Sequence, residues 1–536
     1  MPSEQPDRRY PIIYVRGYAG GQSEVEETTA DPYNGFNVGS TKVRQAWTGE
    51  INRHFFESPL VRLMKEYEYS DVYSDGRELP PDKPVPERPI VIYRYYDITS
   101  KDLGTGVREE IEQQARGLAE LILNLRNRMA GDDAAARQGF RVYLIAHSMG
   151  GLVCRCLLQN DQVIDAARLA EARNAVDKVV TYGTPHNGID LRLIGNVPGF
   201  FTRNNADNFN RKRMREYLGL PPGPDDESVA TLNGKFDPDR FFTVVGTNQR
   251  DYEVGGGAVR SAVGPMSDGL VRIANATVSG PWTVDGKTVR RSCPRAFVHR
   301  AHSGHYGIVN SEEGFQNVVR FLYGDARVDG VLEVASISLP PKIDRIYQEN
   351  KEKEKRGETI KPIRASYHFE AIVRVRGALW DLHRRTVAEG SAVFASFDEL
   401  LRHKEIGLSE PRHPHLFSTF LSRGQRVNTN RRGLGFTVDL AILVPQYEVD
   451  NKLWFDDHYE GGYLYRDKIN LEAIPDDEAP GGWRLRYGFD SRTPNRATTE
   501  VDATPGDGSV SFRVPVKQSS KPGIDAHLVL TARRWA

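Results

Sequence analysis

Short apolar runs alternate with helix-like segments over the first two-thirds of the 536-residue sequence. Six of these runs are rich in β-branched and aromatic residues and are bounded by Gly, Pro, Asn or Asp: residues 11–17, 89–97, 140–148, 177–185, 240–248 and 295–302. Unbroken apolar strands of this kind are typical of a parallel sheet that is covered on both faces. The segments between them therefore have to supply helices for both faces.

The clearest of these helices lies between the second and third runs. Its apolar residues recur at three- and four-residue spacing and predict an amphipathic helix that ends at Gly131; they are Ile111, Ala115, Leu118, Ile122 and Leu125. Residues 311–325 have the pattern of a closing helix. Strand, helix, strand, helix predicts a doubly wound α/β domain over residues 8–328.

Two long segments interrupt this alternation, residues 22–85 after the first strand and residues 189–238 after the fourth. Loops of this length in a compact domain are usually functional covers, so we interpret both as cap insertions. Within the second, "LIGNVPGFF" (193–201) has two apolar clusters hinged on Gly and Pro, which suit either a mobile lid or a fixed wall.

The sequence pattern changes after about residue 328. Runs such as "HFEAIVRVRG" and "GSVSFRVPVK" alternate apolar and polar residues with period two, which predicts half-buried antiparallel strands. We therefore expect a β-rich, sandwich-like accessory domain over residues 329–536. The charged run "QENKEKEKRGETIKP" (348–362) is interpreted as a solvated loop.

Composition excludes some classes of function. Lys plus Arg equals Asp plus Glu, at 72 each, so no net basic field favours nucleic acid. Three cysteines, Cys154, Cys156 and Cys293, are too few for a disulfide framework or a zinc cluster, and we expect buried thiols. No spacing of metal-ligand quality stands out, so neither a metal nor a cofactor is expected.

The expected address is the cytoplasm. Neither a signal peptide nor an apolar run of about 18 residues, long enough to span a membrane, is found. Secretion by a route that needs no signal peptide would leave the same sequence, so that alternative stays open.

The stretch "LIAHSMGG" (144–151) sets a serine between small residues at the end of a predicted strand. In a sharp strand-to-helix turn, the residues two before and two after the turning residue press together, and here they are Ala146 and Gly150. The turning side chain then projects at the carboxyl edge of the sheet, where open α/β folds bind ligands. This pattern predicts that Ser148 is a nucleophile rather than a helix N-cap.

A nucleophilic serine needs a base, an orienting carboxylate and donors for an oxyanion. The glycine-rich turn "RGYAGG" (16–21) could offer the N–H of Tyr18, beside that of Met149, as the two donors. Asp268 in "MSDGLVRI" is the preferred carboxylate and Asp251 is its competitor. For the base, the segment "HRAHSGHYGIVNS" leaves three histidines open: His299, His302 and His305.

Taken together, "RGYAGG", "AHSMGG", "YGTPHNG" (182–188), "SDGLV" and "GHYGIVN" resemble the lipase and esterase branch of the α/β-hydrolase superfamily. The resemblance covers roughly residues 10–325. It implies a triad of Ser148, Asp268 and His305, the last in the family's His-x-Gly-Ile segment. The oxyanion donors implied are Tyr18 and Met149. The sequence departs from the family pattern at Ala146, where glycine is more usual, and at Arg16, where histidine often stands.

The resemblance implies a serine carboxylic-ester hydrolase that acts through an acyl-serine intermediate on a lipid or a smaller ester. Two alternatives stay open. One is a thioesterase, amidase or acyltransferase that uses the same triad. The other is a secreted antibacterial lipase or phospholipase effector whose C-terminal domain is an adaptor. That domain is also a candidate for peripheral contact with a membrane or a protein.

Overall fold

The chain divides into two compact units, Met1–Val318 and Val319–Ala536. The division falls inside helix α10 (Glu312–Tyr323), ahead of the boundary predicted at residue 328. The computed structural model describes residues 8–17, 40–45, 51–56, 58–74, 77–78, 81–95, 97–101, 104–107, 109–189, 207–252, 258–284, 286–304, 306–401, 412–427, 432–450 and 457–535.

The first unit is built on a seven-stranded sheet in the order β13-β10-β9-β8-β1-β7-β4, in which every pair of neighbours is parallel. Each of the six predicted runs supplies a strand, and most of these strands are buried along their whole length. The seven strands of the sheet, of which β4 is the one outside the predicted runs, are β1 (Ile12–Val15), β4 (Ser70–Asp71), β7 (Pro89–Ile92), β8 (Val142–His147), β9 (Val176–Tyr182), β10 (Phe241–Gly246) and β13 (Arg295–Val298).

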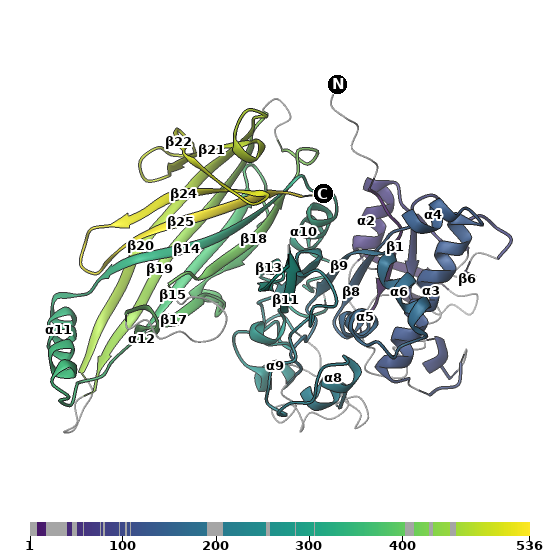
Figure 1. Cartoon of the computed structure of the whole chain (residues 1–536), viewed down its shortest axis with the longest axis horizontal. Helices are drawn as coiled ribbons and strands as arrows, with labels where there is room; N and C mark the ends of the chain where they lie inside the picture. Colours follow the sequence, from purple (N-terminus) through teal and green to yellow (C-terminus); the bar gives the residue numbers. More distant parts are fainter. Residues whose placement is uncertain are drawn as a thin grey trace. The chain divides into compact units, whose positions relative to one another are not determined.

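Helices lie on both sides of this sheet (Figure 1). One group is α3 (Ile111–Ala130), α5 (Gly150–Gln159) and α6 (Ala166–Ala175), which pack against one another. The other is α2 (Ser58–Tyr67) and α10, where the rings of Tyr67 and Phe315 are 6.3 Å apart. Helix α3 ends where the sequence predicts, before Gly131 with φ 55°. The doubly wound α/β architecture is confirmed.

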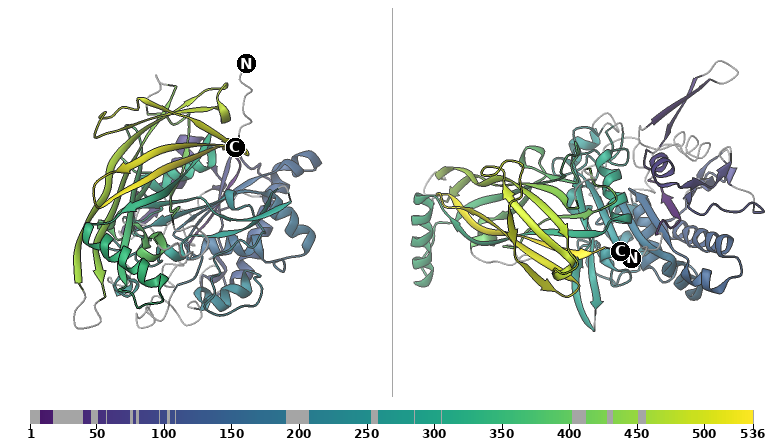
Figure 2. Two further views of the ribbon diagram at one scale, coloured as in Figure 1. Left: turned by 60° about the vertical axis from the view of Figure 1, so that its left-hand side comes forward. Right: turned by 90° about the horizontal axis from the view of Figure 1, so that it is seen from above.

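The structure changes the interpretation of the first insertion, residues 22–85. Strand β4 joins the edge of the main sheet, and α2 packs on α10, with the N–H of Ser58 bonded to the Asn310 side chain at 2.7 Å. Residues 58–71 therefore complete the α/β layers of the first unit and are not a cap. Before them, β2 (Ser40–Gln45) and β3 (Ile51–Phe56) form a hairpin that projects in the right-hand view of Figure 2.

In the second insertion, the proposed lid at 193–201 lies outside the described residues. From residue 207 onward the chain forms short helices, including α8 (Arg211–Tyr217). Along the chain, β10 and β13 are separated by a hairpin that was not predicted, β11 (Ser279–Val284) and β12 (Lys287–Ser292). The remaining short elements are β5 (Tyr73–Ser74), β6 (Arg77–Glu78), η1 (Asp97–Thr99), α4 (Ala134–Gly139), η2 (Asp207–Phe209), η3 (Pro238–Arg240), α9 (Ala258–Val263) and η5 (Ile273–Asn275).

The second unit contains two antiparallel sheets, with orders β18-β14-β25-β24-β23 and β16-β15-β19-β20-β21-β22. Leu332 and Leu528 of the first and Val373 and Ile442 of the second belong to one buried core, as expected for a sandwich. Figure 2 shows the long, twisted strands. They are β14 (Ala326–Ser338), β15 (Ile363–Val375), β16 (His383–Arg385), β17 (Val393–Ser396), β18 (His415–Leu421), β19 (Leu434–Val449), β20 (Asp457–Pro475), β21 (Trp483–Phe489), β22 (Thr499–Val501), β23 (Ala503–Gly506), β24 (Ser509–Gln518) and β25 (Gly523–Arg534).

The loop predicted at residues 348–362 is wrong for its first half. Helix α11 runs from Pro341 to Lys355, and it buries Ile343 while Ile346 and Tyr347 pack against the core. These apolar residues precede the charged run, so the run continues a helix whose other faces are solvated. The described residues of this unit also form three short helices: η6 (Val387–Glu389), α12 (Phe397–Leu401) and η7 (Pro480–Gly482).

Candidate active site

Ser148 lies in the turn between β8 and α5, with φ 51°. A positive φ is uncommon for a residue with a side chain and is costly unless the surroundings enforce it. Here the serine N–H donates to the Tyr182 carbonyl at 2.8 Å, and the Thr184 hydroxyl donates to the serine carbonyl at 2.8 Å. The structure thus places Ser148 at the strained strand-to-helix turn that the sequence predicts.

Gly150, two residues after the serine, has no room for a side chain. A Cβ added at Gly150 would lie 2.3 Å from the Val15 carbonyl oxygen and 2.5 Å from that of Arg16. The tightest approach at Gly150 is therefore between α5 and the end of β1. Since even a methyl group would collide with backbone, only glycine fits here without a shift of one element.

The imidazole beside the serine belongs to His302. Its Nε2 lies 3.0 Å from the Ser148 Oγ, and its Nδ1 lies 2.8 Å from the Asp268 Oδ2. The prediction of His305 as the base is therefore corrected to His302; His305 itself lies outside the described residues. The reason is a tertiary contact of the backbone, because the His302 N–H also donates to the Asp268 carbonyl at 2.9 Å and fixes this histidine against the aspartate.

Asp268 is the carboxylate of the site, as predicted. One of its oxygens faces His302, and the other accepts the N–H groups of Leu270 at 3.0 Å and Val271 at 2.7 Å. The competitor Asp251 instead accepts the side-chain N–H of Asn248 in a turn. Because a carboxylate only accepts, the proton of His302 is assigned to Nδ1, which leaves Nε2 as an acceptor for the serine hydroxyl.

His147 is a residue of the site that the sequence analysis quoted in a motif but gave no role. Its Nε2 is 3.1 Å from the His302 carbonyl oxygen, so that nitrogen carries the proton. The two imidazole rings are tilted by 38° with centroids 5.1 Å apart. Burial, with a smaller contribution from the nearby His302, lowers the pKa of His147 to about 3, so its ring is neutral.

The predicted oxyanion donors are only partly described. Met149 is buried and stands at the N-terminus of α5, and Tyr18 lies outside the described residues. Gly17, the residue before Tyr18, closely approaches Ser148. A Cβ added at Gly17 would lie 3.2 Å from the Ser148 Cβ and 2.8 Å from the His147 Nδ1. The turn after β1 therefore reaches the serine, and the donor assignment remains a prediction.

Arg155 braces the helix that follows the serine, and no sequence signal predicted it. Its side chain is fully buried on α5 and donates to the carbonyls of His186 at 2.8 Å, Val229 at 2.7 Å and Thr231 at 2.8 Å. Burial lowers the pKa of Arg155 to about 10, so the group stays protonated near neutral pH. This cation ties helix α5 to the segments that follow β9.

The three cysteines are buried free thiols, and burial raises the pKa of Cys154 and Cys156. In the part of the chain that the structure describes, no three His, Cys, Asp or Glu side chains are grouped so as to hold a metal ion. The described helices include none with the length and apolar character needed to cross a membrane.

Comparisons with known proteins bear on the fold of the first unit. Residues 100–218, which contain Ser148, match the family model described as "PGAP1-like alpha/beta domain". The first unit has the fold of the α/β-hydrolase superfamily, and the resemblance inferred from the motifs is confirmed. None of the curated proteins compared with this chain matches it.

Three solved structures are among the similar ones. The mature form of lipase BlEst2 from Bacillus licheniformis has 17% identity and a TM-score of 0.26, covering 60% of this chain and 94% of its own. The form with its propeptide has 13% identity and a TM-score of 0.27, covering 89% and 97%. Lipase 1 from Pelosinus fermentans has 11% identity and a TM-score of 0.26, covering 57% and 94%.

Proposed function

We propose that the first unit is a serine hydrolase of carboxylic esters that uses Ser148, His302 and Asp268. One observation carries this proposal: the serine hydroxyl, the imidazole and the carboxylate form a single hydrogen-bonded relay, with distances of 3.0 and 2.8 Å. The relay sits on a strained turn at the carboxyl edge of a parallel sheet. That combination supports nucleophilic catalysis more directly than it supports a structural role.

In the acylation step, the Ser148 Oγ attacks the ester carbonyl carbon while the His302 Nε2 takes the hydroxyl proton. A C–O bond forms, and the carbonyl oxygen becomes an oxyanion. The N–H of Met149 is one proposed donor to this oxyanion, and the N–H of Tyr18 is the other. Collapse of the tetrahedral species breaks the bond to the alkoxy group, which leaves as an alcohol with the proton from His302.

In the deacylation step, water attacks the acyl-serine and gives a proton to the His302 Nε2. The bond to Oγ breaks, the carboxylic acid leaves, and the proton returns to the serine oxygen. Throughout, Asp268 accepts the Nδ1–H of His302 and stabilises the transient imidazolium, which favours the tautomer that the first step needs. We propose an acyl ester, either a lipid or a smaller ester, as the substrate.

The test is covalent labelling with a fluorophosphonate probe, followed by hydrolysis of chromogenic esters with short and long acyl chains. Ser148→Ala should abolish both labelling and hydrolysis. His302→Gln should slow both by about a thousandfold or more, as loss of a triad member does in other hydrolases. His305→Gln is the matched control, and it should retain labelling close to that of the unchanged protein.

Two results would contradict the proposal. Labelling that survives Ser148→Ala would place the nucleophile elsewhere. Equal loss in the His302 and His305 variants, with both proteins folded by circular dichroism, would remove the assignment of His302 as the base. Hydrolysis of thioesters or amides faster than of matched oxygen esters would keep the nucleophile and change the substrate class.

A further inference from the structure

The second unit contains a pocket of about 390 Å³ that the proposed hydrolysis does not use. It lies at one end of the sandwich, where β15 and β18 end and β19 begins. Ligand sites commonly have volumes of a few hundred Å³ with an apolar lining and a few polar groups. The pocket of the second unit fits that description in its size and in its lining of apolar and charged side chains.

The floor of the pocket is apolar. Val375, Leu421 and Leu434 are each less than a tenth exposed and line the pocket from both sheets. At its edge, Val427 has 55% of its surface exposed, and a Cβ added at Gly377 would lie 3.0 Å from the Val427 Cγ1. The two loops that bound the pocket therefore meet through an aliphatic side chain that faces solvent.

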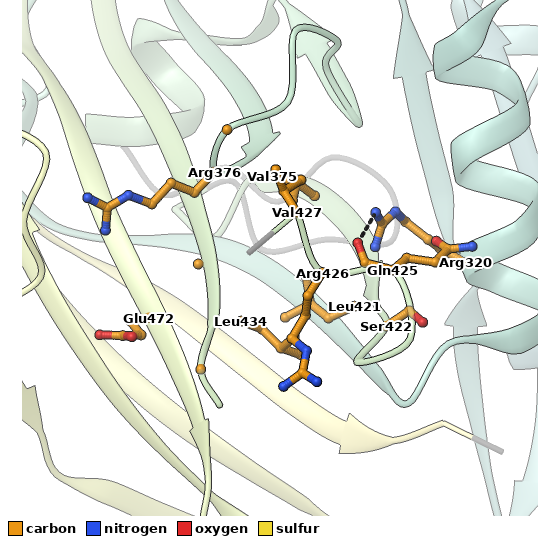
Figure 3. Close-up of a pocket in the computed structure, with 13 residues that line it drawn as sticks. Arg320, Val375, Arg376, Leu421, Ser422, Gln425, Arg426, Val427, Leu434 and Glu472 are labelled. Carbon is orange, nitrogen blue, oxygen red and sulfur yellow. Dashed lines mark hydrogen bonds between the residues drawn. The ribbon is translucent and has the colours of Figure 1, made fainter. Parts of the chain in front are cut away.

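The charged groups of the lining are three arginines and one glutamate, an excess of two positive charges. Arg320 comes from α10 and Arg426 from the loop after β18, whereas Arg376 directly follows β15 and Glu472 lies on β20; Figure 3 shows the four side chains. Arg320 is buried, and its guanidinium carbon lies 5.4 Å from the centre of the Trp380 ring. Arg376 donates to the Asn495 carbonyl, which holds it at the strand side.

Glu472 faces Arg320 and Arg426 from the strand side of the pocket, the side on which Arg376 also lies. Its carboxylate packs over bare backbone, since a Cβ added at Gly433 would lie 2.7 Å from the Glu472 Oε1. An anion in the pocket would therefore be attracted by Arg426 and Arg320 and repelled by Glu472. The position of the negative group follows from this asymmetry: it lies on the side of the loop after β18, away from β20.

We propose that this pocket binds an amphipathic anion, a carboxylate or phosphate group that carries a short aliphatic chain. The chain packs on Val375, Leu421 and Leu434, and the anionic group is held near Arg426. Coulomb attraction in a partly desolvated site favours the anion over a cation of the same chain. The inference does not depend on hydrolysis in the first unit, although the carboxylic acid released by an ester hydrolase belongs to this ligand class.

The experiment measures binding to the full-length protein by isothermal titration calorimetry. The probes are decanoate, decyl phosphate, inorganic phosphate and decyltrimethylammonium. Decanoate and decyl phosphate should bind with Kd values on the order of 0.1 mM, and decyltrimethylammonium should bind at least about tenfold more weakly. Inorganic phosphate alone should bind weakly too, because it lacks the chain. Vesicles of phosphatidylcholine with and without phosphatidylglycerol, in a sedimentation assay, test whether the anion is presented on a membrane.

Four variants locate the site. Arg426→Gln should weaken decanoate binding about three- to tenfold, and Glu472→Gln should strengthen it by a similar factor, because the two changes remove charges of opposite sign. Val427→Ser, at an exposed position, should weaken the binding of decanoate and of decyl phosphate, because it removes an aliphatic contact for their chains. Arg364→Gln is the matched control; its side chain is 61% exposed on β15, pairs with Asp450 and does not line the pocket.

Binding that is equal for the cationic and anionic probes would overturn the proposal, and so would binding that is unchanged by both charge variants. Decanoate that binds in the active site of the first unit instead would be unaffected by Arg426→Gln and Glu472→Gln. Sedimentation with anionic vesicles in the absence of any binding of dispersed decanoate would also overturn it, in favour of a surface contact. Failure of fluorophosphonate labelling leaves these measurements unaffected, so the two proposals fail separately.

Discussion

The protein should be more stable with glycine at position 148 than with alanine. The φ of Ser148, 51°, lies in the left-handed region, which costs a residue with a side chain about 1–2 kcal/mol. Ser148→Ala keeps that cost and loses the 3.0 Å hydrogen bond to His302. Ser148→Gly loses the same hydrogen bond but releases the strain. The difference between the two variants therefore isolates the backbone term.

The magnitude follows from two opposing contributions. Glycine releases about 1–2 kcal/mol of strain and costs about 0.5–1 kcal/mol in added freedom of the unfolded chain. Ser148→Gly should then be about 0.5–1 kcal/mol more stable than Ser148→Ala. Relative to the unchanged protein, the alanine variant should lose about 1 kcal/mol for the missing hydrogen bond, and the glycine variant should lie near zero.

Hydrogen exchange measured by mass spectrometry is the appropriate assay. With two compact units, a single melting temperature has no simple meaning, whereas exchange of the peptide that contains β8 reports on the first unit alone. Ser279 in β11 is the control site, because it is a strand residue outside the positive-φ region. There, glycine should be less stable than alanine. The reasoning about Ser148 is refuted if its glycine variant opens as readily as its alanine variant, or more readily.

Three further outcomes are expected. Gly150→Ala should cost about 1–3 kcal/mol and most of the labelling, whereas Gly139→Ala, with no atom near the added carbon, should cost nothing by the same exchange assay. His147→Phe keeps a ring but loses the hydrogen bond to the His302 carbonyl, so kcat should fall about tenfold with KM unchanged. The pH–rate profile between pH 5 and 8 should keep its shape, because the pKa of His147 is about 3. Burial alone would raise the pKa of Asp329, yet Arg327, His415 and Ser418 hold this pKa below its ordinary value. The unfolded state therefore binds a proton more readily than the folded state, and the stability that this group contributes is lost as the pH falls below about 4. Hydrogen exchange of peptides from β14 should show this loss of stability in acid, and Asp329→Asn should remove it.

Local patterns in the sequence predicted the elements that depend on neighbours along the chain. The apolar run before Ser148 and the spacing from Ile111 to Leu125 each predicted a correct element, because burial on one or both faces imposes a period that can be read directly. The hairpin β11–β12 was missed because β12 is mostly exposed and carries no such period. Helix α11 was missed because its apolar residues precede the charged run at 348–362, and that run by itself indicated a solvated loop.

The identity of the base could not be read from the sequence. His299, His302 and His305 lie at three-residue intervals in one segment, and spacing to the following Gly-Ile favoured the last. What selects His302 is a tertiary contact, the hydrogen bond from its N–H to the carbonyl of Asp268, a residue 34 positions away. No local preference encodes that contact, so the family spacing decided the prediction and decided it wrongly.

The relay also depends on what is missing beside it. A Cβ added at Gly183 would lie 3.0 Å from the His302 Nδ1 and 3.1 Å from the Asp268 Oδ2, and one added at Gly246 would lie 2.7 Å from the Asp268 Cβ. These glycines follow β9 and end β10, so two neighbouring strands end without side chains at the place where the aspartate and histidine meet. The motif "YGTPHNG" contributed to the recognition of the fold, and its first glycine, Gly183, leaves the space that the His302 and Asp268 side chains occupy. Since the relay needs hydrogen-bond distances of about 3 Å to transfer protons, the strand ends have to be bare for the three side chains to converge.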